Sequence, residues 1–337
     1  MTADPIDLFT TCPTFDGSDS EAYVKRVHDV SRWSDEAGCK GILVYTDNSV
    51  VDPWLISQKI IQNTKALSPL VAVQPVYMHP YTVSKMVSSL SYLHSRRMCL
   101  NLVAGGFKND LAALDDSTPH DKRYDRLVEY STIISRLLTG DTPVSFEGEF
   151  YRVANLSLKP PLPNELFPII TISGSSAAGL AAAKSLGAIP VKYPEPPEQC
   201  TIQSELRNNG CGIRLGIIAR EYEGEAWKVA DERFPPHRQG QLMHALAMKA
   251  SDSVWHRTLS DLGGDVQQQR STYWLWPFQN YKTFCPYLVG SYEQVANEIG
   301  RYLSSGYRTF ILDVPASEED LTHIRKVCVE AQQMVTL

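Results

Sequence analysis

Short apolar segments alternate with amphipathic segments along almost the whole chain. Eight apolar segments have the length and composition of β-strands, at residues 6–11, 41–45, 70–74, 98–103, 169–173, 188–193, 214–219 and 309–314. Several are nearly continuous apolar runs rather than alternating ones, which is typical of parallel strands buried on both faces. The pattern therefore predicts a parallel sheet covered by helices.

The segments between these strands have helical periodicity. Clear examples are residues 21–37, 83–95, 123–138 and 177–186, and Gly38 and Gly187 follow two of them, where a left-handed helix C-cap is expected. Eight strands with helical crossovers favour a closed barrel over an open doubly wound sheet. We predict a single (β/α)₈ TIM barrel domain spanning residues 1–337.

Two insertions are expected in this barrel, one after strand 4 and one after strand 7. Residues 105–121 follow the fourth strand, and residues 221–290 follow the seventh and contain a cluster of aromatic residues. Residues 144–153 surround Glu147-Gly148 and predict a short β-hairpin.

Charge and hydropathy exclude several classes of protein. The net charge is −6 and no run of Lys and Arg occurs, so a nucleic-acid surface is not expected. No uninterrupted apolar stretch of about 18 residues is present, which predicts no membrane span. The N-terminal residues lack the basic and apolar regions of a signal peptide, so we expect a cytoplasmic protein.

The seven cysteines are scattered and form no CxxC pair. A zinc site needs Cys and His ligands at short, repeated spacing, and no HExxH motif occurs either. We predict no metal site and interpret the cysteines as small buried side chains.

The active site of a β/α barrel lies at the carboxyl ends of its strands, and several polar segments fall there. Ser173-Gly174-Ser175-Ser176 leads from a strand into a helix, whose N-terminal N–H groups suit a phosphate. A capped βα turn explains the same residues without a ligand. His120 and Tyr124 begin another helix, and this segment is either a second phosphate contact or a solvated helix start.

Two further strand ends carry candidate ligand contacts. Asn101-Leu102-Val103-Ala104 runs into two glycines, where a flat ring can lie against the backbone or the chain can simply turn. Thr46 ends the second strand, before Asp52-Pro53, which has the pattern of a helix start.

Together these segments resemble the luciferase-like flavin-dependent monooxygenases, most closely the alkanesulfonate monooxygenase branch. The resemblance extends from about residue 6 to residue 320. It rests on NLVAGG, HDKRYD, FEGEFY, SGSS, EPPE, IRLGIIAR and LVG, which occur in the family's order and spacing.

The resemblance implies a two-component enzyme that uses reduced FMN and O₂ to oxidise a small organic substrate through a flavin peroxide. The reduced FMN would come from a separate NAD(P)H:FMN reductase, and relatives imply a homodimer or homotetramer. The implied contacts to FMN are Thr46, Asn101, Ala104, His120, Tyr124, Ser173, Gly174, Ser175 and Ser176. Arg214 and Lys282 are the implied catalytic residues, with Lys282 in a segment, residues 267–285, that matches the family's lid.

The chain also departs from the alkanesulfonate branch. Val50, Gly216 and Val314 stand where that branch carries Cys, His and Tyr, and its lid Arg aligns near Tyr281 or Lys282. Arg214 is retained. Its side chain either pairs with an anionic substrate or the flavin peroxide, or forms a structural ion pair. These departures make C–S cleavage doubtful and leave hydroxylation, amine or sulfur oxidation and Baeyer–Villiger insertion open. Both a biosynthetic and a sulfur-assimilation role remain open.

Two rival functions fit the same barrel. One is a deazaflavin (F420)-dependent oxidoreductase, which would transfer hydride without O₂. The other is a catalytically inactive flavin-binding homologue, because three polar positions are lost. HDKRY and NLVAGG favour the monooxygenase.

Overall fold

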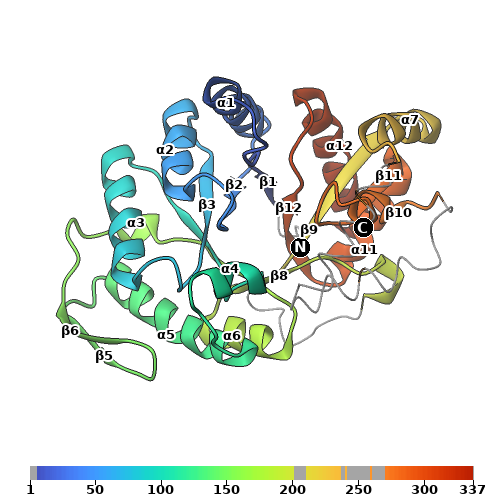
Figure 1. The fold of residues 1–337 in the computed structure, drawn as a ribbon. Helices are drawn as coiled ribbons and strands as arrows, with labels where there is room; N and C mark the ends of the chain where they lie inside the picture. The colour runs from blue at the N-terminus through green and yellow to red at the C-terminus, as the bar shows by residue number, and fades with distance from the viewer. Residues whose placement is uncertain (1–5, 201–209, 237–239, 241–258, 260–269, 337) are drawn as a thin grey trace. The chain divides into compact units, whose positions relative to one another are not determined.

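The structure is a computed structural model that describes residues 6–200, 210–236, 240, 259 and 270–336. All eight predicted strands form, close to their predicted bounds (Figure 1). They are β1 (Asp7–Thr11), β2 (Gly41–Val44), β3 (Ser68–Val73), β4 (Cys99–Leu102), β7 (Ile170–Ser173), β8 (Ile189–Lys192), β9 (Cys211–Arg220) and β12 (Tyr307–Leu312).

Strand order closes the sheet. The strands run β12-β1-β2-β3-β4-β7-β8, and β9 pairs with both β8 and β12. The pairs whose register is defined, such as β2 with β3 and β9 with β12, are parallel. The predicted (β/α)₈ barrel is therefore confirmed.

Helices connect the strands as the periodicity predicts. They are α1 (Ser20–Glu36), α2 (Pro53–Asn63), α3 (Pro80–His94), α4 (Lys108–Ala113), α5 (His120–Leu138), α6 (Ala177–Leu186), α7 (Glu223–Arg233), α10 (Trp276–Gln279), α11 (Tyr292–Ser304) and α12 (Glu318–Thr336). Within the described residues, two short 3₁₀ helices, η1 (Asn164–Leu166) and η2 (Pro197–Gln199), lie in connections.

The insertions fall after the fourth and seventh barrel strands, as predicted. The first contains α4, and the predicted hairpin forms as β5 (Val144–Glu147) and β6 (Arg152–Leu156). The second contains α7, β10 (Tyr273–Trp274), α10 and β11 (Tyr287–Ser291), with β11 parallel to β9. Residues 237–239, 241–258 and 260–269 of this predicted insertion lie outside the described residues.

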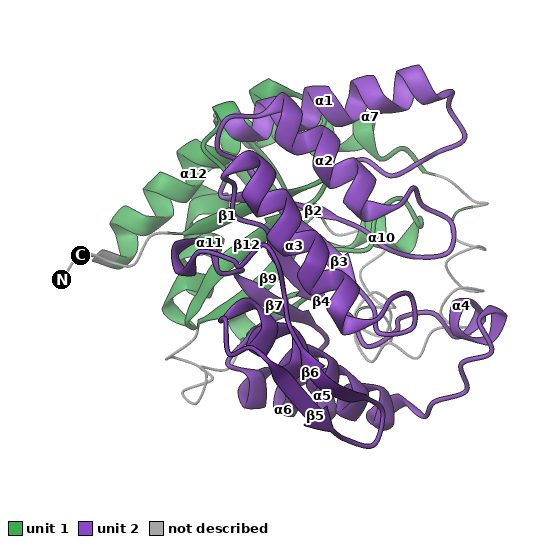
Figure 2. Cartoon of the chain, turned by 90° about the vertical axis from the view of Figure 1, so that its left-hand side faces the viewer, with its two compact units in different colours: residues 1–11, 36–39, 191–337 green, residues 12–35, 40–190 purple. Residues whose placement is uncertain are grey.

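The chain divides into two compact units (Figure 2). Unit 1 contains residues 1–11, 36–39 and 191–337, and unit 2 contains residues 12–35 and 40–190. Unit 2 carries the strands β2 to β7, and unit 1 carries β1, β9, β10, β11 and β12. A single domain over residues 1–337 stays a prediction.

Each unit has its own apolar core. In unit 2, side chains of α3 and α5 such as Val87, Leu127 and Ile133 pack with strand residues such as Leu100. In unit 1, Ala226 and Trp227 of α7 pack with Ile218 of β9 and Tyr287 of β11. Among the described residues, every helix is too short or too polar to cross a membrane.

Local sequence signals set the helix boundaries near the candidate site. The carboxylate of Asp52 accepts hydrogen bonds from the N–H groups of Trp54 and Leu55, at 2.9 and 3.1 Å, and Pro53 begins α2. At α6, Ser176 is the N-cap, and Gly187 ends the helix with φ +62°. Both arrangements follow the sequence prediction.

Glu129 fixes the hairpin to α5. Its carboxylate accepts hydrogen bonds from the N–H groups of Glu149, Phe150 and Tyr151, at 2.7, 2.9 and 3.0 Å. A Cβ on Gly148 would lie only 2.5 Å from this carboxylate, so a larger residue there would displace Glu129 from its three N–H donors. The FEGEFY motif is therefore explained by local structure.

Candidate active site

The turn from β7 into α6 forms the first part of the candidate site, in unit 2. Ser176 accepts a hydrogen bond from the N–H of Gly179 at 3.1 Å and so uses its side chain to cap α6. The first N–H groups of a helix have no acceptor within the helix, so those of Ala177 and Ala178 face outward from this N-terminus. They form a place for an anion.

Tyr124 and His120 come to the same turn from the first residues of α5. The Tyr124 side chain is buried, and its hydroxyl shares a hydrogen bond with Ser176. Burial raises the pKa of Tyr124, and the hydrogen bond with Ser176 opposes that rise. The His120 ring lies 5.4 Å from the Tyr124 ring, and its Nδ1 is 2.7 Å from Asp121. The phenol is therefore a protonated donor at the helix N-terminus.

Gly174 makes the approach of Tyr124 possible. Its φ is +150°, which side chains rarely adopt, and a Cβ there would collide with the Tyr124 hydroxyl. Ser175 is half-buried at the same turn. The structure thus brings five of the predicted contacts together, at His120, Tyr124, Gly174, Ser175 and Ser176. A phosphate group fits these donors.

Ser173 belongs to a neighbouring polar cluster rather than to the helix start. Its hydroxyl and that of Thr171 donate to the side-chain oxygen of Asn101, at 3.0 and 2.8 Å. Asn101 lies opposite Thr171 where β4 pairs with β7, and its side chain is almost fully buried. Asn101 is therefore held in one orientation at the carboxyl end of β4.

The remaining two predicted contacts lie at other strand ends of unit 2. Ala104 is buried just beyond β4. Thr46 follows β2, and its carbonyl accepts a hydrogen bond from the Gln74 amide at 3.3 Å. Thr46 thus belongs to the β2–β3 edge of the sheet and not to the β7–α6 turn.

In unit 1, Arg214 belongs to a largely buried polar group that we call the Asp313 cluster: Asp313, Arg214, Thr283, Tyr287 and Tyr193. The guanidinium of Arg214 donates to the Tyr193 hydroxyl at 3.2 Å and lies 3.7 Å from Asp313. Asp313 also accepts hydrogen bonds from Thr283 at 2.5 Å and from Tyr287 at 2.8 Å.

Gly216 allows the Asp313 cluster to form. Strand β9 lies between β11 and β12, and Tyr287 on β11 is in register with Gly216 on β9. The Tyr287 ring lies against Gly216, and its hydroxyl reaches Asp313, the residue that follows β12. A Cβ at position 216 would collide with this ring. Burial and then the charge of Asp313 raise the pKa of Tyr287 well above its usual range, so this phenol remains a donor.

Lys282, the second predicted catalytic residue, is placed differently. Its side chain is exposed and its N–H donates to the carbonyl of Pro277, whereas the adjacent Thr283 is buried and reaches Asp313. A catalytic role for Lys282 stays a prediction. Of the lid predicted at residues 267–285, positions 267–269 lie outside the described residues.

Sequence reasoning missed four members of the Asp313 cluster: Tyr193, Thr283, Tyr287 and Asp313. Tyr193 and Asp313 each follow directly after a barrel strand, at the edge where chemistry is expected. That position was the available signal. Tyr287 carried no such signal, because its strand is not one of the eight in the barrel.

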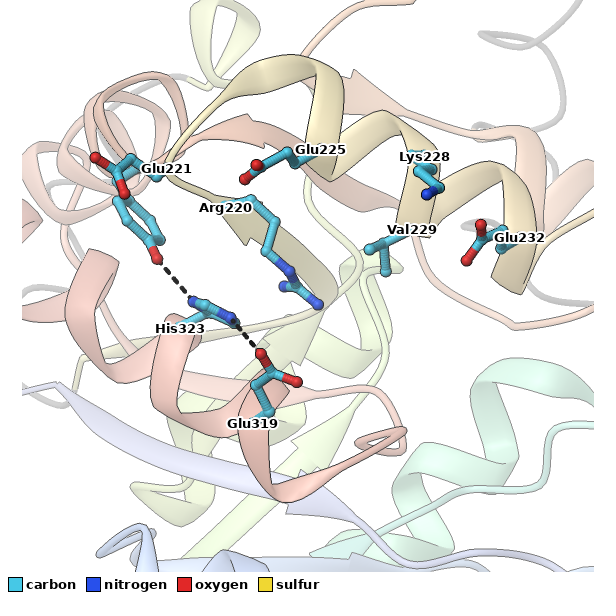
Figure 3. Close-up of a pocket in the computed structure, with 9 residues that line it drawn as sticks. Arg220, Glu221, Glu225, Lys228, Val229, Glu232, Glu319 and His323 are labelled. Carbon is cyan, nitrogen blue, oxygen red and sulfur yellow. Dashed lines mark hydrogen bonds and ion pairs between the residues drawn. The ribbon is translucent and has the colours of Figure 1, made fainter.

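A surface pocket in unit 1 offers a different environment (Figure 3). It lies among β9, α7, α11 and α12, and four carboxylates line it: Glu221, Glu225, Glu232 and Glu319. His323 joins Tyr292 at 2.8 Å to Glu319 at 3.6 Å. Arg220 and Lys228 supply fewer positive charges than the four glutamates supply negative ones. A flavin phosphate is disfavoured there.

Comparison with known proteins agrees with this arrangement. The profile described as luciferase-like monooxygenase matches residues 6–309. A curated relative from Niallia circulans, 4-(gamma-L-glutamylamino)butanoyl-[BtrI acyl-carrier protein] monooxygenase BtrO, is 36% identical over 304 residues, which cover 88% of this chain and 89% of the relative.

Two solved structures share the fold. The riboflavin lyase RcaE, solved with modified FMN and riboflavin, has a TM-score of 0.75 at 15% identity, covering 97% of this chain and 92% of its own. The EDTA monooxygenase EmoA from Chelativorans sp. BNC1 has a TM-score of 0.71 at 15% identity, covering 99% and 94%. The chain belongs to the luciferase-like monooxygenase family and is a flavin-dependent monooxygenase.

Proposed function

We propose that the chain is the oxygenase of a two-component system that uses reduced FMN and O₂. The arrangement of Tyr124, Gly174 and the α6 N-terminus carries the proposal, because it brings several hydrogen-bond donors together where a phosphate can accept them. The exposed carboxylate of Asp121 lies 2.7 Å from Nδ1 of His120. FMN has such a phosphate. The reduced flavin, supplied by an NAD(P)H-dependent reductase, provides the activation of O₂.

The residues of the chain would bind and orient this cofactor. The α6 N-terminus and Tyr124 would hold the phosphate, and the amide of Asn101, fixed by Thr171 and Ser173, would lie beside the ring. The buried surroundings of Asn101 would keep water away from the reacting atoms. In this proposal the enzyme works in the cytoplasm, as a homodimer or homotetramer.

We further propose that the substrate is an acyl group carried by an acyl-carrier protein. The name of the Niallia circulans relative gives it a substrate of this kind, and 36% identity over most of both chains supports a related substrate here. The assignment to a biosynthetic enzyme is favoured over sulfur assimilation for the same reason. The alkanesulfonate monooxygenase branch carries Cys, His and Tyr where this chain has Val50, Gly216 and Val314. These differences agree with a substrate other than an alkanesulfonate.

Replacing Tyr124 with phenylalanine, or Ser175 with alanine, is expected to weaken FMN binding about five- to tenfold. Each change removes one hydrogen bond to the phosphate, and such bonds contribute about 1 kcal/mol. Flavin fluorescence quenching measures the dissociation constant.

Two matched variants control for unrelated effects on the same helices. Tyr130→Phe changes a buried tyrosine further along α5, and Ser185→Ala changes a serine at the far end of α6, where its hydroxyl bonds to Ala182. Both should bind FMN like the wild type. Unchanged FMN binding by both Tyr124→Phe and Ser175→Ala would show that the phosphate site is elsewhere.

A further inference from the structure

The Asp313 cluster carries opposite charges side by side within unit 1. Arg214 supplies a positive charge and Asp313, 3.7 Å away, a negative one. Their side chains are only 8% and 14% exposed, so water screens this pair weakly. The charges of Arg214 and Asp313 therefore offset one another at this position.

The hydrogen bonds of Asp313 keep its negative charge next to Arg214. One carboxylate oxygen accepts the hydroxyls of both Thr283 and Tyr287, and the other faces the guanidinium. Thr283 and Tyr287 thereby fix the counterion of Arg214.

The place of the Asp313 cluster in the barrel supports contact with a substrate. Arg214 lies in barrel strand β9, and Asp313 follows immediately after barrel strand β12, where its N–H continues the ladder by donating to Leu215. The carboxyl ends of barrel strands are where β/α barrels bind their substrates. Asp313 retains some exposure at this end.

We infer that Asp313 determines substrate specificity: by balancing Arg214, it makes the site select an uncharged reacting group and reject a sulfonate. Arg214 would attract an anion but Asp313 would repel it, and the anion would also lose its hydration on entering the site. An amide- or thioester-linked acyl chain loses much less hydration free energy than an anion does. This inference rests on the proposed function, because it names the class of substrate for the same enzyme.

The test uses methanesulfonate as the probe and needs neither flavin nor turnover. Isothermal titration calorimetry on the full chain should show no binding by the wild type. Asp313→Asn keeps the shape and an acceptor oxygen but removes the negative charge beside Arg214, so it should bind methanesulfonate at least about tenfold more tightly than the detection limit that bounds the wild type. Adding Arg214→Gln to this variant should abolish the gain.

Asp231→Asn is the matched control. It also removes the carboxylate partner of an arginine, Arg270, but that pair is 62% and 53% exposed. It changes the net charge equally and should bind no methanesulfonate. Near-UV circular dichroism confirms that each variant is folded.

Two results would overturn the inference: methanesulfonate binding by the wild type as tight as by Asp313→Asn, or binding by Asp313→Asn no tighter than by Asp231→Asn. Failure of FMN binding would instead overturn the proposed cofactor and would leave the inference about Arg214 and Asp313 untouched. The two failures are thus distinguishable.

Discussion

Replacing Gly216 with alanine is expected to lower the free energy of unfolding by about 3 kcal/mol. The added methyl group would collide with three ring atoms of Tyr287, and this ring cannot move aside because it is buried and bonded to Asp313. Urea unfolding followed by fluorescence measures the loss, with an unchanged m-value showing that the native state stays compact.

Two comparisons isolate the cause of this loss. Gly224→Ala should cost nothing, since no atom lies within 4 Å of its added Cβ. In a Tyr287→Ala background, Gly216→Ala should cost less than about 1 kcal/mol, because the colliding ring is gone. An equal cost in both backgrounds would show that the Tyr287 ring is not what requires glycine at position 216.

Asp320→Asn should lower the free energy of unfolding by about 3–5 kcal/mol, the usual cost of breaking a buried ion pair. The Asp320 side chain is 3% exposed and bonds to two arginines, Arg220 at 2.9 Å and Arg233. The substitution leaves two cations beside each other without their shared counterion. It also loosens the connection among the end of β9, the end of α7 and the start of α12, and urea unfolding measures the combined effect.

Asp231→Asn provides the matched control for this measurement. The Asp231–Arg270 pair is more than half exposed, and such surface pairs contribute about 0–1 kcal/mol. If the two substitutions destabilise the chain equally, burial of Asp320 is not what makes its ion pairs important.

The barrel strands and several helix starts could be predicted because their sequence signals lie within a few neighbouring residues. The apolar runs of β2 and β4 are long enough to identify buried strands, and Asp52-Pro53 and Ser176 mark helix starts. Strand β11 was not predicted as a strand. It pairs in parallel with residues 216–220 of β9, a partner that is distant in the sequence, and its five residues are too few to identify it alone.

The two parts of the candidate site were predictable to different degrees. Gly174 and Ser176 lie within one four-residue turn, and Tyr124 shares a helix start with His120, so local position and the family resemblance were enough to predict them as phosphate contacts. The Asp313 cluster depends on pairing between strands distant in the sequence. Gly216 looked like the loss of a polar group, but the structure shows that the Tyr287 ring occupies that space and brings its hydroxyl to Asp313.

The central claim is that the chain binds reduced FMN through its phosphate, and anaerobic titration with three reduced cofactors tests it most directly. Reduced FMN should bind at least about tenfold more tightly than reduced riboflavin, which lacks the phosphate, and more tightly than reduced F420. Tyr124→Phe should narrow the difference in affinity between reduced FMN and reduced riboflavin. Equal binding of reduced FMN and riboflavin, or tighter binding of reduced F420, would contradict the account.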